Sequence, residues 1–195
     1  MSKDKKAIKI VLLGDSGVGK TSIVTRYVSG TLLENVKPTV GAAFVTKDIV
    51  VGKNNFELLI WDTAGQEVYR GLAPIYYRNA RIAVIVFDVA MSSSFESVHY
   101  WIDELKTNVS ENVIILVCAN KIDLEERRVV DQARIDALIK KYNVLFAETS
   151  AKNNVGIDKM FQDLISKIGD LDQHLENEKD KTILKENKSE NKCNC

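Results

Sequence analysis

The sequence has little cysteine and proline, no long apolar run and no excess of either charge. Among 195 residues there are three cysteines and two prolines, and 27 basic residues balance 27 acidic ones to a formal net charge of zero. So few cysteines exclude a secreted disulfide framework, and a chain without basic excess is not expected to bind nucleic acid. No apolar run approaches the ~20 residues that a membrane-spanning helix needs.

The beginning of the chain also lacks the features of a targeting signal. The short apolar run after the first residues is broken by Lys9, so that no signal-peptide core forms, and Ser2 stands where N-myristoylation requires glycine. We therefore expect a cytoplasmic protein.

What is present suits one globular domain, since 45% of the residues are apolar. Strand patterns alternate with helix patterns over residues 7–170, which predicts an α/β domain with a mainly parallel sheet. A hairpin of 42–51 and 55–62 adds one antiparallel edge strand. Residues 1–6 and the charged stretch 171–195, which is almost without aromatic residues, are expected to be flexible.

Several helix ends carry local signals. Gly30 is expected to end a helix over about 19–29, and Asp131 to cap a helix that reaches about 142. The run Ser92–Ser94 offers an N-cap for a helix that reaches about 108. Residues 63–71 predict an irregular loop, and Cys118 is expected to be a small core residue in a buried strand.

The motif with the clearest chemistry is Gly14–Thr21, with the spacing G-x-x-x-x-G-K-[ST] between an apolar strand and a helix. Such a loop directs backbone N–H groups at phosphate, Lys20 adds a cation, and the Thr21 hydroxyl suits Mg²⁺. A merely structural glycine-rich turn is the alternative, which the flanking strand and helix disfavour. The candidate binding residues are Asp15, Ser16, Gly17, Val18, Gly19, Lys20, Thr21 and Ser22.

Two further segments predict the metal and the reaction. Asp62 ends an apolar strand and is expected to hold Mg²⁺, although a strand-end aspartate also caps turns. Gly65 allows its N–H to approach a terminal phosphate, and Gln66 is the candidate catalytic residue that orients water. Thr39, in a long loop, is a candidate third metal ligand with Thr21 and Asp62, and an ordinary loop threonine is the alternative.

The base is expected to bind to two later segments. Asp123 can accept hydrogen bonds from both donors of guanine, a pair that adenine lacks, while Asn120 braces the loop and the stem of Lys121 covers the ring. Ser150, Ala151 and Lys152 are expected to present a backbone N–H to the base carbonyl. Taken singly, each short motif is weak, because loop Asn and Asp residues usually serve turns.

Together these motifs resemble the small GTPases of the Ras superfamily, and the stretches 38–44, 61–67 and 72–78 are similar to the early-endosomal branch of the Rab family. The resemblance implies a six-stranded P-loop G domain with five main helices, which hydrolyses GTP to GDP with Mg²⁺ and regulates vesicle trafficking. It also implies an exchange factor, a GTPase-activating protein, a GDP-dissociation inhibitor, an escort protein and effectors. The implied effector surface is Phe44, Trp61 and Tyr76, which by themselves indicate core or sheet-edge aromatics.

The end of the chain resembles the C-x-C terminus at which Rab proteins carry two geranylgeranyl groups. Two lipids on Cys193 and Cys195 would anchor the protein stably to endosomal or other endomembranes. Exposed thiols that oxidise or bind a metal are the alternative. The sequence departs from the family pattern at Leu32, where many relatives have an aromatic residue against guanine, and at Val68, where an arginine is common.

Two other functions compete with a regulatory GTPase. A nucleotide-binding scaffold without turnover is supported only by Leu32, and the presence of Gln66 and Thr39 argues against it. A P-loop kinase or ATPase would need an adenine pocket, which Asn120–Asp123 disfavours.

Overall fold

The computed structural model describes residues 5–32, 37–52, 54–109 and 113–169. The elements are β1 (Lys6–Leu13), α1 (Lys20–Ser29), β2 (Ala42–Val51), β3 (Asn54–Thr63), the 3-10 helix η1 (Glu67–Leu72), α2 (Ala73–Tyr77), β4 (Ile82–Asp88), α3 (Ser92–Asn108), β5 (Ile114–Asn120), the 3-10 helix η2 (Ile122–Arg127), α4 (Gln132–Tyr142) and β6 (Leu145–Thr149). A further helix covers residues 157–169. The chain divides into two compact units, 1–160 and 161–195, and only 161–169 of the second are described.

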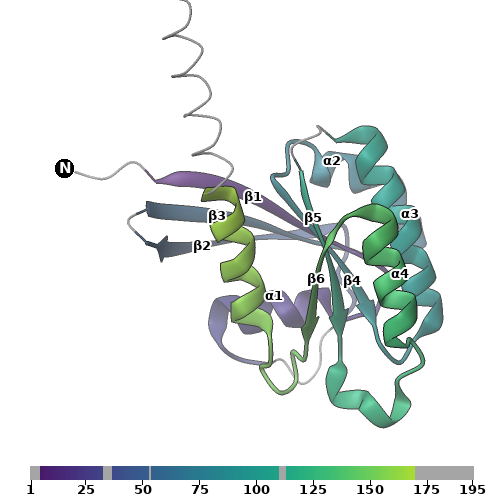
Figure 1. Ribbon diagram of the computed structural model, residues 1–195. Helices are drawn as coiled ribbons and strands as arrows, with labels where there is room; N and C mark the ends of the chain where they lie inside the picture. Colours follow the sequence, from purple (N-terminus) through teal and green to yellow (C-terminus); the bar gives the residue numbers. More distant parts are fainter. Residues whose placement is uncertain (1–4, 33–36, 53, 110–112, 170–195) are drawn as a thin grey trace, which may run out of the picture. The chain divides into compact units, whose positions relative to one another are not determined.

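The strands form one six-stranded sheet in the order β2-β3-β1-β4-β5-β6 (Figure 1). β1 pairs in parallel with β3 and β4, and β5 pairs in parallel with β4 and β6. Only β2 runs antiparallel, against β3, and it lies at the edge. This arrangement confirms the predicted fold class, and the predicted hairpin supplies the antiparallel strand.

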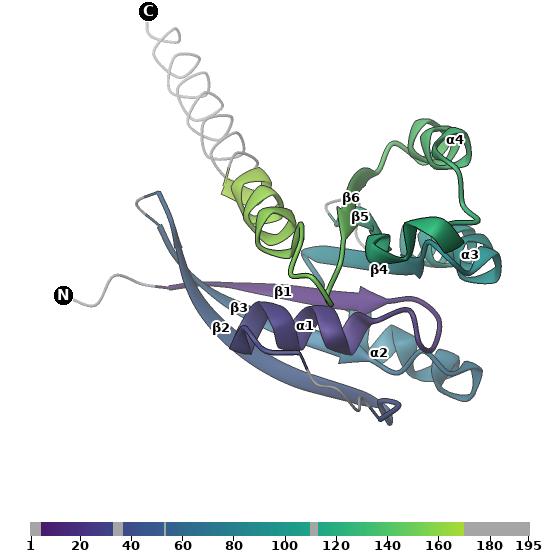
Figure 2. The same ribbon diagram turned by 90° about the horizontal axis from the view of Figure 1, so that it is seen from below.

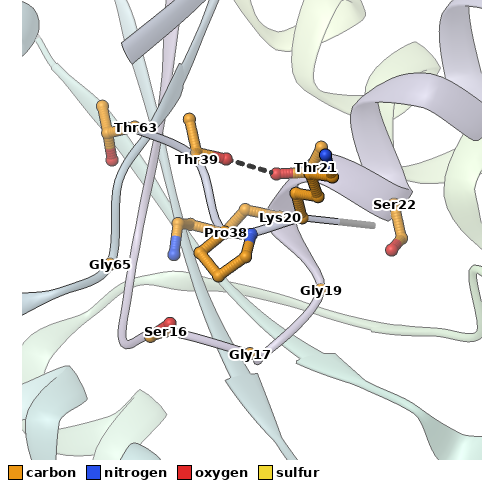
Figure 3. Close-up of a pocket in the computed structure, with 11 residues that line it drawn as sticks. Ser16, Gly17, Gly19, Lys20, Thr21, Ser22, Pro38, Thr39, Thr63 and Gly65 are labelled. Carbon is orange, nitrogen blue, oxygen red and sulfur yellow. Dashed lines mark hydrogen bonds between the residues drawn. The ribbon is translucent and has the colours of Figure 1, made fainter. Parts of the chain in front are cut away.

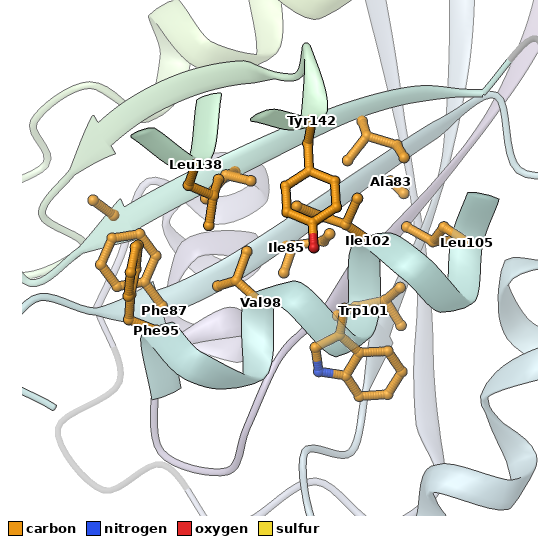
Figure 4. Close-up of a cluster of buried hydrophobic side chains, with 14 of the residues drawn as sticks. Ala83, Ile85, Phe87, Phe95, Val98, Trp101, Ile102, Leu105, Leu138 and Tyr142 are labelled. Atoms are coloured by element: carbon orange, nitrogen blue, oxygen red, sulfur yellow. The ribbon is translucent and has the colours of Figure 1, made fainter. Parts of the chain in front are cut away.

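The central strands are apolar throughout because helices cover both faces of the sheet. All seven residues of β4 are buried. On one face, Ala83, Ile85 and Phe87 pack with side chains of α2, α3 and α4, among them Phe95 and Leu138 (Figure 4). The alternate residues of the strands face the other way, and α1 runs along β1 and β3 (Figure 2).

Two predicted helix ends are confirmed. Gly30 follows α1 with a φ of 73°, and its N–H donates to Arg26 O at 2.9 Å. Asp131 caps α4, since its side chain accepts a hydrogen bond of 2.9 Å from the backbone N–H of Arg134. Residues 67–72, predicted to be irregular, form η1 instead.

The predicted serine cap of α3 is wrong. The helix begins at Ser92, and Met91 precedes it without any side-chain cap. The hydroxyl of Ser94, buried in the first turn, donates to Met91 O at 2.7 Å and accepts from the backbone N–H of Asp88 at 3.1 Å. The serine therefore connects the end of β4 to α3 rather than capping the helix.

Some predictions fall outside the described residues. These are most of the N-terminal segment 1–6, residues 33–36 of the first loop, and the tail 171–195 with Cys193 and Cys195. Within the described ranges, no helix has the length and apolar character required to cross a bilayer. Cys118 lies fully buried in β5, as predicted.

The Asp131 cap gives a stability prediction. Replacing Asp131 with Ala leaves the first N–H groups of α4 without their acceptor, so we expect the free energy of unfolding to fall by about 1 kcal/mol in urea titrations. Asp131→Asn keeps an acceptor and should lose much less. Equal losses in both variants would contradict a capping role.

Candidate nucleotide-binding site

The predicted motifs meet at one edge of the sheet. The glycine-rich loop (residues 14–21) follows β1, Asp62 lies near the end of β3, Asn120 ends β5, and Ser150 follows β6. Because these strands are parallel, their carboxyl ends share one edge, where ligands of α/β proteins bind. The topology thus gathers residues that are more than a hundred positions apart in the chain.

The glycine-rich loop is packed too closely for side chains at two positions. A Cβ on Gly14, whose φ is 133°, would lie 2.2 Å from Val86 O, and a Cβ on Gly19, whose φ is 101°, would lie 2.3 Å from Asn120 Nδ2. Both the backbone angles and the neighbours therefore require glycine. The first contact places the loop against β4, and the second places it against the predicted base-binding motif.

The loop encloses a cavity of about 220 Å³ with the first loop and the end of β3 (Figure 3). It is lined by Ser16, Gly17, Gly19, Lys20, Thr21, Ser22, Lys37, Pro38, Thr39, Thr63 and Gly65. Lys20 is buried, and its Nζ donates to Gly14 O at 2.7 Å and to Asp15 O at 2.8 Å. Burial lowers the pKa of Lys20 to about 8, against the opposing effect of Asp62 and Asp15. A buried cation under a loop of backbone amides suits an anionic ligand.

Three side-chain oxygens converge beside Lys20. The hydroxyls of Thr21 and Thr39 lie 2.9 Å apart, and Thr21 Oγ1 donates to Asp62 Oδ2 at 2.6 Å. Asp62 Oδ1 is buried and has no hydrogen-bond partner. Burial raises the pKa of Asp62, partly offset by the hydrogen bond from Thr21. An unpartnered carboxylate oxygen beside two hydroxyls is the donor set that Mg²⁺ prefers, so the residues fit the predicted metal.

Gly65 and Gln66 follow β3 on the other side of the loop. A Cβ on Gly65 would lie 2.3 Å from the carbonyl carbon of Asp15, so the backbone of Gly65 contacts the glycine-rich loop directly. Gln66 precedes η1, and its carbonyl accepts from the N–H of Tyr69 at 3.0 Å. Among the described residues, the cavity lining reaches Gly65 but not Gln66.

Asp15, predicted to bind nucleotide, uses its side chain elsewhere. Its Oδ1 lies 3.3 Å from Arg70 in η1, and its Oδ2 accepts 2.7 Å from the hydroxyl of Ser97 in α3. Only the backbone of Asp15 faces Lys20. Neither Arg70 nor Ser97 carries a sequence signal that would have identified this contact.

Asn120 joins the glycine-rich loop to the base-binding segments. It is buried, its Nδ2 donates to Val18 O at 2.8 Å, and its Oδ1 accepts from the hydroxyl of Thr149 at 3.1 Å. Thr149 Oγ1 also lies 3.1 Å from Cys118 Sγ, and burial raises the pKa of that thiol to about 12. Sequence reasoning missed Thr149, although its place directly before Ser150 in a buried strand was a signal.

The two residues predicted to hold the base also have protein partners. Lys121 adopts a φ of 66°, and its Nζ lies 2.8 Å from Asp88 Oδ2. Asp123 Oδ1 accepts a 2.6 Å hydrogen bond from the hydroxyl of Ser150. The base-binding segments after β5 and β6 are therefore in direct contact, as their predicted joint role requires.

The predicted effector aromatics form a row across β2, β3 and α2. The ring centroids of Phe44 and Trp61 are 5.1 Å apart, and those of Trp61 and Tyr76 are 5.8 Å apart. Phe44 is 50% exposed, whereas Trp61 and Tyr76 are half-buried and also pack against the core. Both expectations for these residues, surface and core, thus hold in part of the row.

Comparisons with known proteins agree on one family. A family model described as "Ras family" matches residues 9–170. The chain is 42% identical to "Ras-related protein RabJ" of Dictyostelium discoideum over 160 residues, which are 82% of this chain and 62% of that protein. It is 41% identical to "Ras-related protein Rab-31" of Homo sapiens over 169 residues, 87% of each chain. It is 39% identical to "Ras-related protein Rab-5A" of Dictyostelium discoideum, over 82% of this chain and 80% of that protein.

Thr149 gives a prediction for this site. Thr149→Val removes the hydroxyl that donates to Asn120 Oδ1 and leaves a buried acceptor unpaired, so we expect GDP to dissociate roughly fivefold faster. Release of a fluorescent GDP analogue measures this rate. Thr46→Val, the same change at an exposed position of β2, is the control. An unchanged rate in Thr149→Val would show that Asn120 needs no support from β6.

Proposed function

Because the chain belongs to the Ras family of small GTPases, and within it to the Rab proteins, which bind guanine nucleotide and hydrolyse GTP, we propose that it is a GTP-dependent switch of endocytic membrane transport. One observation carries the proposal. Thr21, Thr39 and Asp62 come from α1, the first loop and β3, and their oxygens meet at one point. A ligand at that point affects two loops at once.

The glycine-rich loop and Lys20 would bind the phosphates, and Asp123 would recognise guanine. The buried Lys20 supplies a positive charge within a loop of backbone amides, and α1 directs its N-terminus at the same place. Mg²⁺, when bound by Thr21, Thr39 and Asp62, would neutralise charge on the outer phosphates. The unpartnered Asp62 Oδ1 supports this assignment.

The same residues would make the site sensitive to the terminal phosphate. Thr39 belongs to the first loop and is held near Thr21 by a single hydroxyl contact of 2.9 Å. Gly65 is in contact with the glycine-rich loop and begins the segment that contains η1. Loss of the terminal phosphate would release both segments, which is how a two-state switch is built.

Hydrolysis would depend on Gln66, which is too weak a base to do more than orient the attacking water. The nearby Arg70 is engaged by Asp15 and by Glu67, 3.8 Å away. No cationic side chain is therefore evidently supplied in cis to stabilise the transition state. We expect slow intrinsic hydrolysis and a GTPase-activating protein that acts in trans, while an exchange factor replaces GDP.

Effectors would bind the row of Phe44, Trp61 and Tyr76. The exposed apolar residues Val68 and Ile75 belong to η1 and α2, which border this row. Exposed apolar surface of this kind is typical of protein interaction sites. Since η1 begins at the segment that would respond to the phosphate, effector binding would depend on the bound nucleotide.

Membrane attachment would come from geranylgeranyl groups on Cys193 and Cys195. The similarity to Rab-31 and Rab-5A supports endosomal membranes as the destination, with an escort protein and a GDP-dissociation inhibitor as carriers. The chain would then alternate between the cytoplasm and the cytosolic face of the membrane.

Gln66→Leu tests the enzymatic part of the proposal. The change removes the group that positions water, so we expect single-turnover hydrolysis of GTP to slow about tenfold or more. Release of labelled phosphate measures it. Gln132→Leu, the same substitution at the exposed start of α4, should hydrolyse GTP at the unaltered rate. Hydrolysis at the unaltered rate in Gln66→Leu would contradict the role of Gln66, and no hydrolysis by the unaltered protein, even with an activating protein, would contradict the proposed function.

Replacing Cys193 and Cys195 with Ser tests the anchor. The double variant, expressed in cells that geranylgeranylate proteins, should leave the membrane fraction, and each single variant should bind weakly, because one chain gives only marginal attachment. Flotation with vesicles measures the bound fraction. Cys118→Ala, which changes the buried cysteine, should float normally. Flotation of the double variant would place the anchor elsewhere.

A further inference from the structure

Arg26, a residue of α1 without an assigned role, donates to three backbone carbonyls. Its guanidinium bonds to Gly30 O at 2.9 Å, to Ala151 O at 3.0 Å and to Lys152 O at 3.2 Å. The last two belong to the turn of residues 150–154, which an antiparallel bridge between Ser150 and Val155 closes. One half-buried side chain therefore connects α1 to the segment after β6.

These bonds continue to Asp123 without a gap. The carbonyl of Lys152 shares a peptide group with the N–H of Asn153, which donates to Ser150 Oγ at 3.0 Å. Ser150 Oγ in turn donates to Asp123 Oδ1 at 2.6 Å. Each step is a rigid peptide plane or a hydrogen bond of ordinary length, so the position of Arg26 affects the orientation of the Asp123 carboxylate.

The bond to Ala151 O has a second consequence. None of the described peptide bonds is cis, so the carbonyl of Ala151 and the N–H of Lys152 point in opposite directions across one planar group. With the carbonyl held by Arg26, the N–H of Lys152 faces away from the Arg26 guanidinium. Arg26 thereby fixes the direction of a donor in the turn that is expected to face the base.

We propose that Arg26 is a positioning residue for guanine: it holds the 150–154 turn so that Asp123 accepts both donors of the base. This inference rests on the proposed binding of guanine nucleotide. A role confined to stability would affect the retention of every nucleotide equally. A positioning role affects guanine more than a base that lacks the exocyclic amine.

The test compares the release of GDP and of IDP, since inosine lacks only the 2-amino group of guanine. In the unaltered protein GDP should dissociate more slowly than IDP. In Arg26→Ala we expect GDP to dissociate about tenfold faster, because hydrogen bonds from a charged group are lost, and IDP to accelerate much less. The ratio of the two rates should therefore fall toward one. Stopped-flow displacement of fluorescent GDP and IDP analogues, at saturating Mg²⁺, gives both rates.

Three further variants sharpen the test. Arg134→Ala removes an arginine that bonds Glu96 on the far helices, and both rates should be unchanged. Thr149→Val weakens Asn120 rather than Asp123, so it should accelerate GDP and IDP equally. Arg26→Lys keeps the positive charge with one donor group instead of a planar fork, and should fall between the unaltered protein and Arg26→Ala. It carries the comparison if Arg26→Ala does not fold, which circular dichroism detects.

The outcomes separate the two proposals. If the unaltered protein retains no guanine nucleotide, the proposed function fails. If it retains GDP, but Arg26→Ala or Arg26→Lys leaves the GDP rate unchanged or accelerates GDP and IDP equally, Arg26 has no positioning role and only this inference is overturned. A selective loss of GDP retention supports it.

Discussion

The structure depends above all on the contact between Asn120 and the glycine-rich loop. Asn120 is buried at the end of β5, and its amide donates to Val18 O while lying where any Cβ on Gly19 would have to be. One side chain thus holds together the segment that would bind phosphate and the segment that would bind the base. Because an unpaired buried amide is costly, the contact also favours a single arrangement of the two. The cavity exists between segments that this contact keeps in place.

Burial of opposite charges at the edge of the sheet follows from that arrangement. Lys20 and Asp62 are both buried, and burial lowers the pKa of the lysine and raises that of the aspartate. Each charge makes the other more favourable, and neither is fully satisfied, since Asp62 Oδ1 has no partner. Such a pair is poorly justified by stability alone. It is well suited to a polyanion and a divalent cation that complete the neutralisation, and the loops of Thr39 and Gly65 lie where they would respond.

Much of this could be predicted from the sequence because the informative residues sit at strand ends. The apolar runs indicate buried strands, the alternation indicates a parallel sheet, and parallel strands place Gly14, Asp62, Asn120 and Ser150 at one edge. What could not be predicted depends on contacts between distant segments. The cap expected of Ser94 is replaced by a bond to Asp88, because the packing of α3 on β4 decides which backbone groups lie near its hydroxyl. The partners of Asp15 are likewise set by how η1 and α3 pack, which no local pattern encodes.

The two halves of the site are connected a second time, through α1. The helix begins at Lys20 and Thr21, which face the phosphate and metal positions, and Arg26 lies two turns later at the carbonyls of the 150–154 turn. A helix of this length moves as a rigid body, with a rise of about 1.5 Å per residue. A displacement of α1 at its first residues therefore also displaces Arg26, and with it the turn that contacts Asp123. Arg26 also bonds Gly30, where the first loop begins. Opening that loop, as an exchange factor would, disturbs phosphate and base contacts together, and so one local movement would suffice to release the nucleotide.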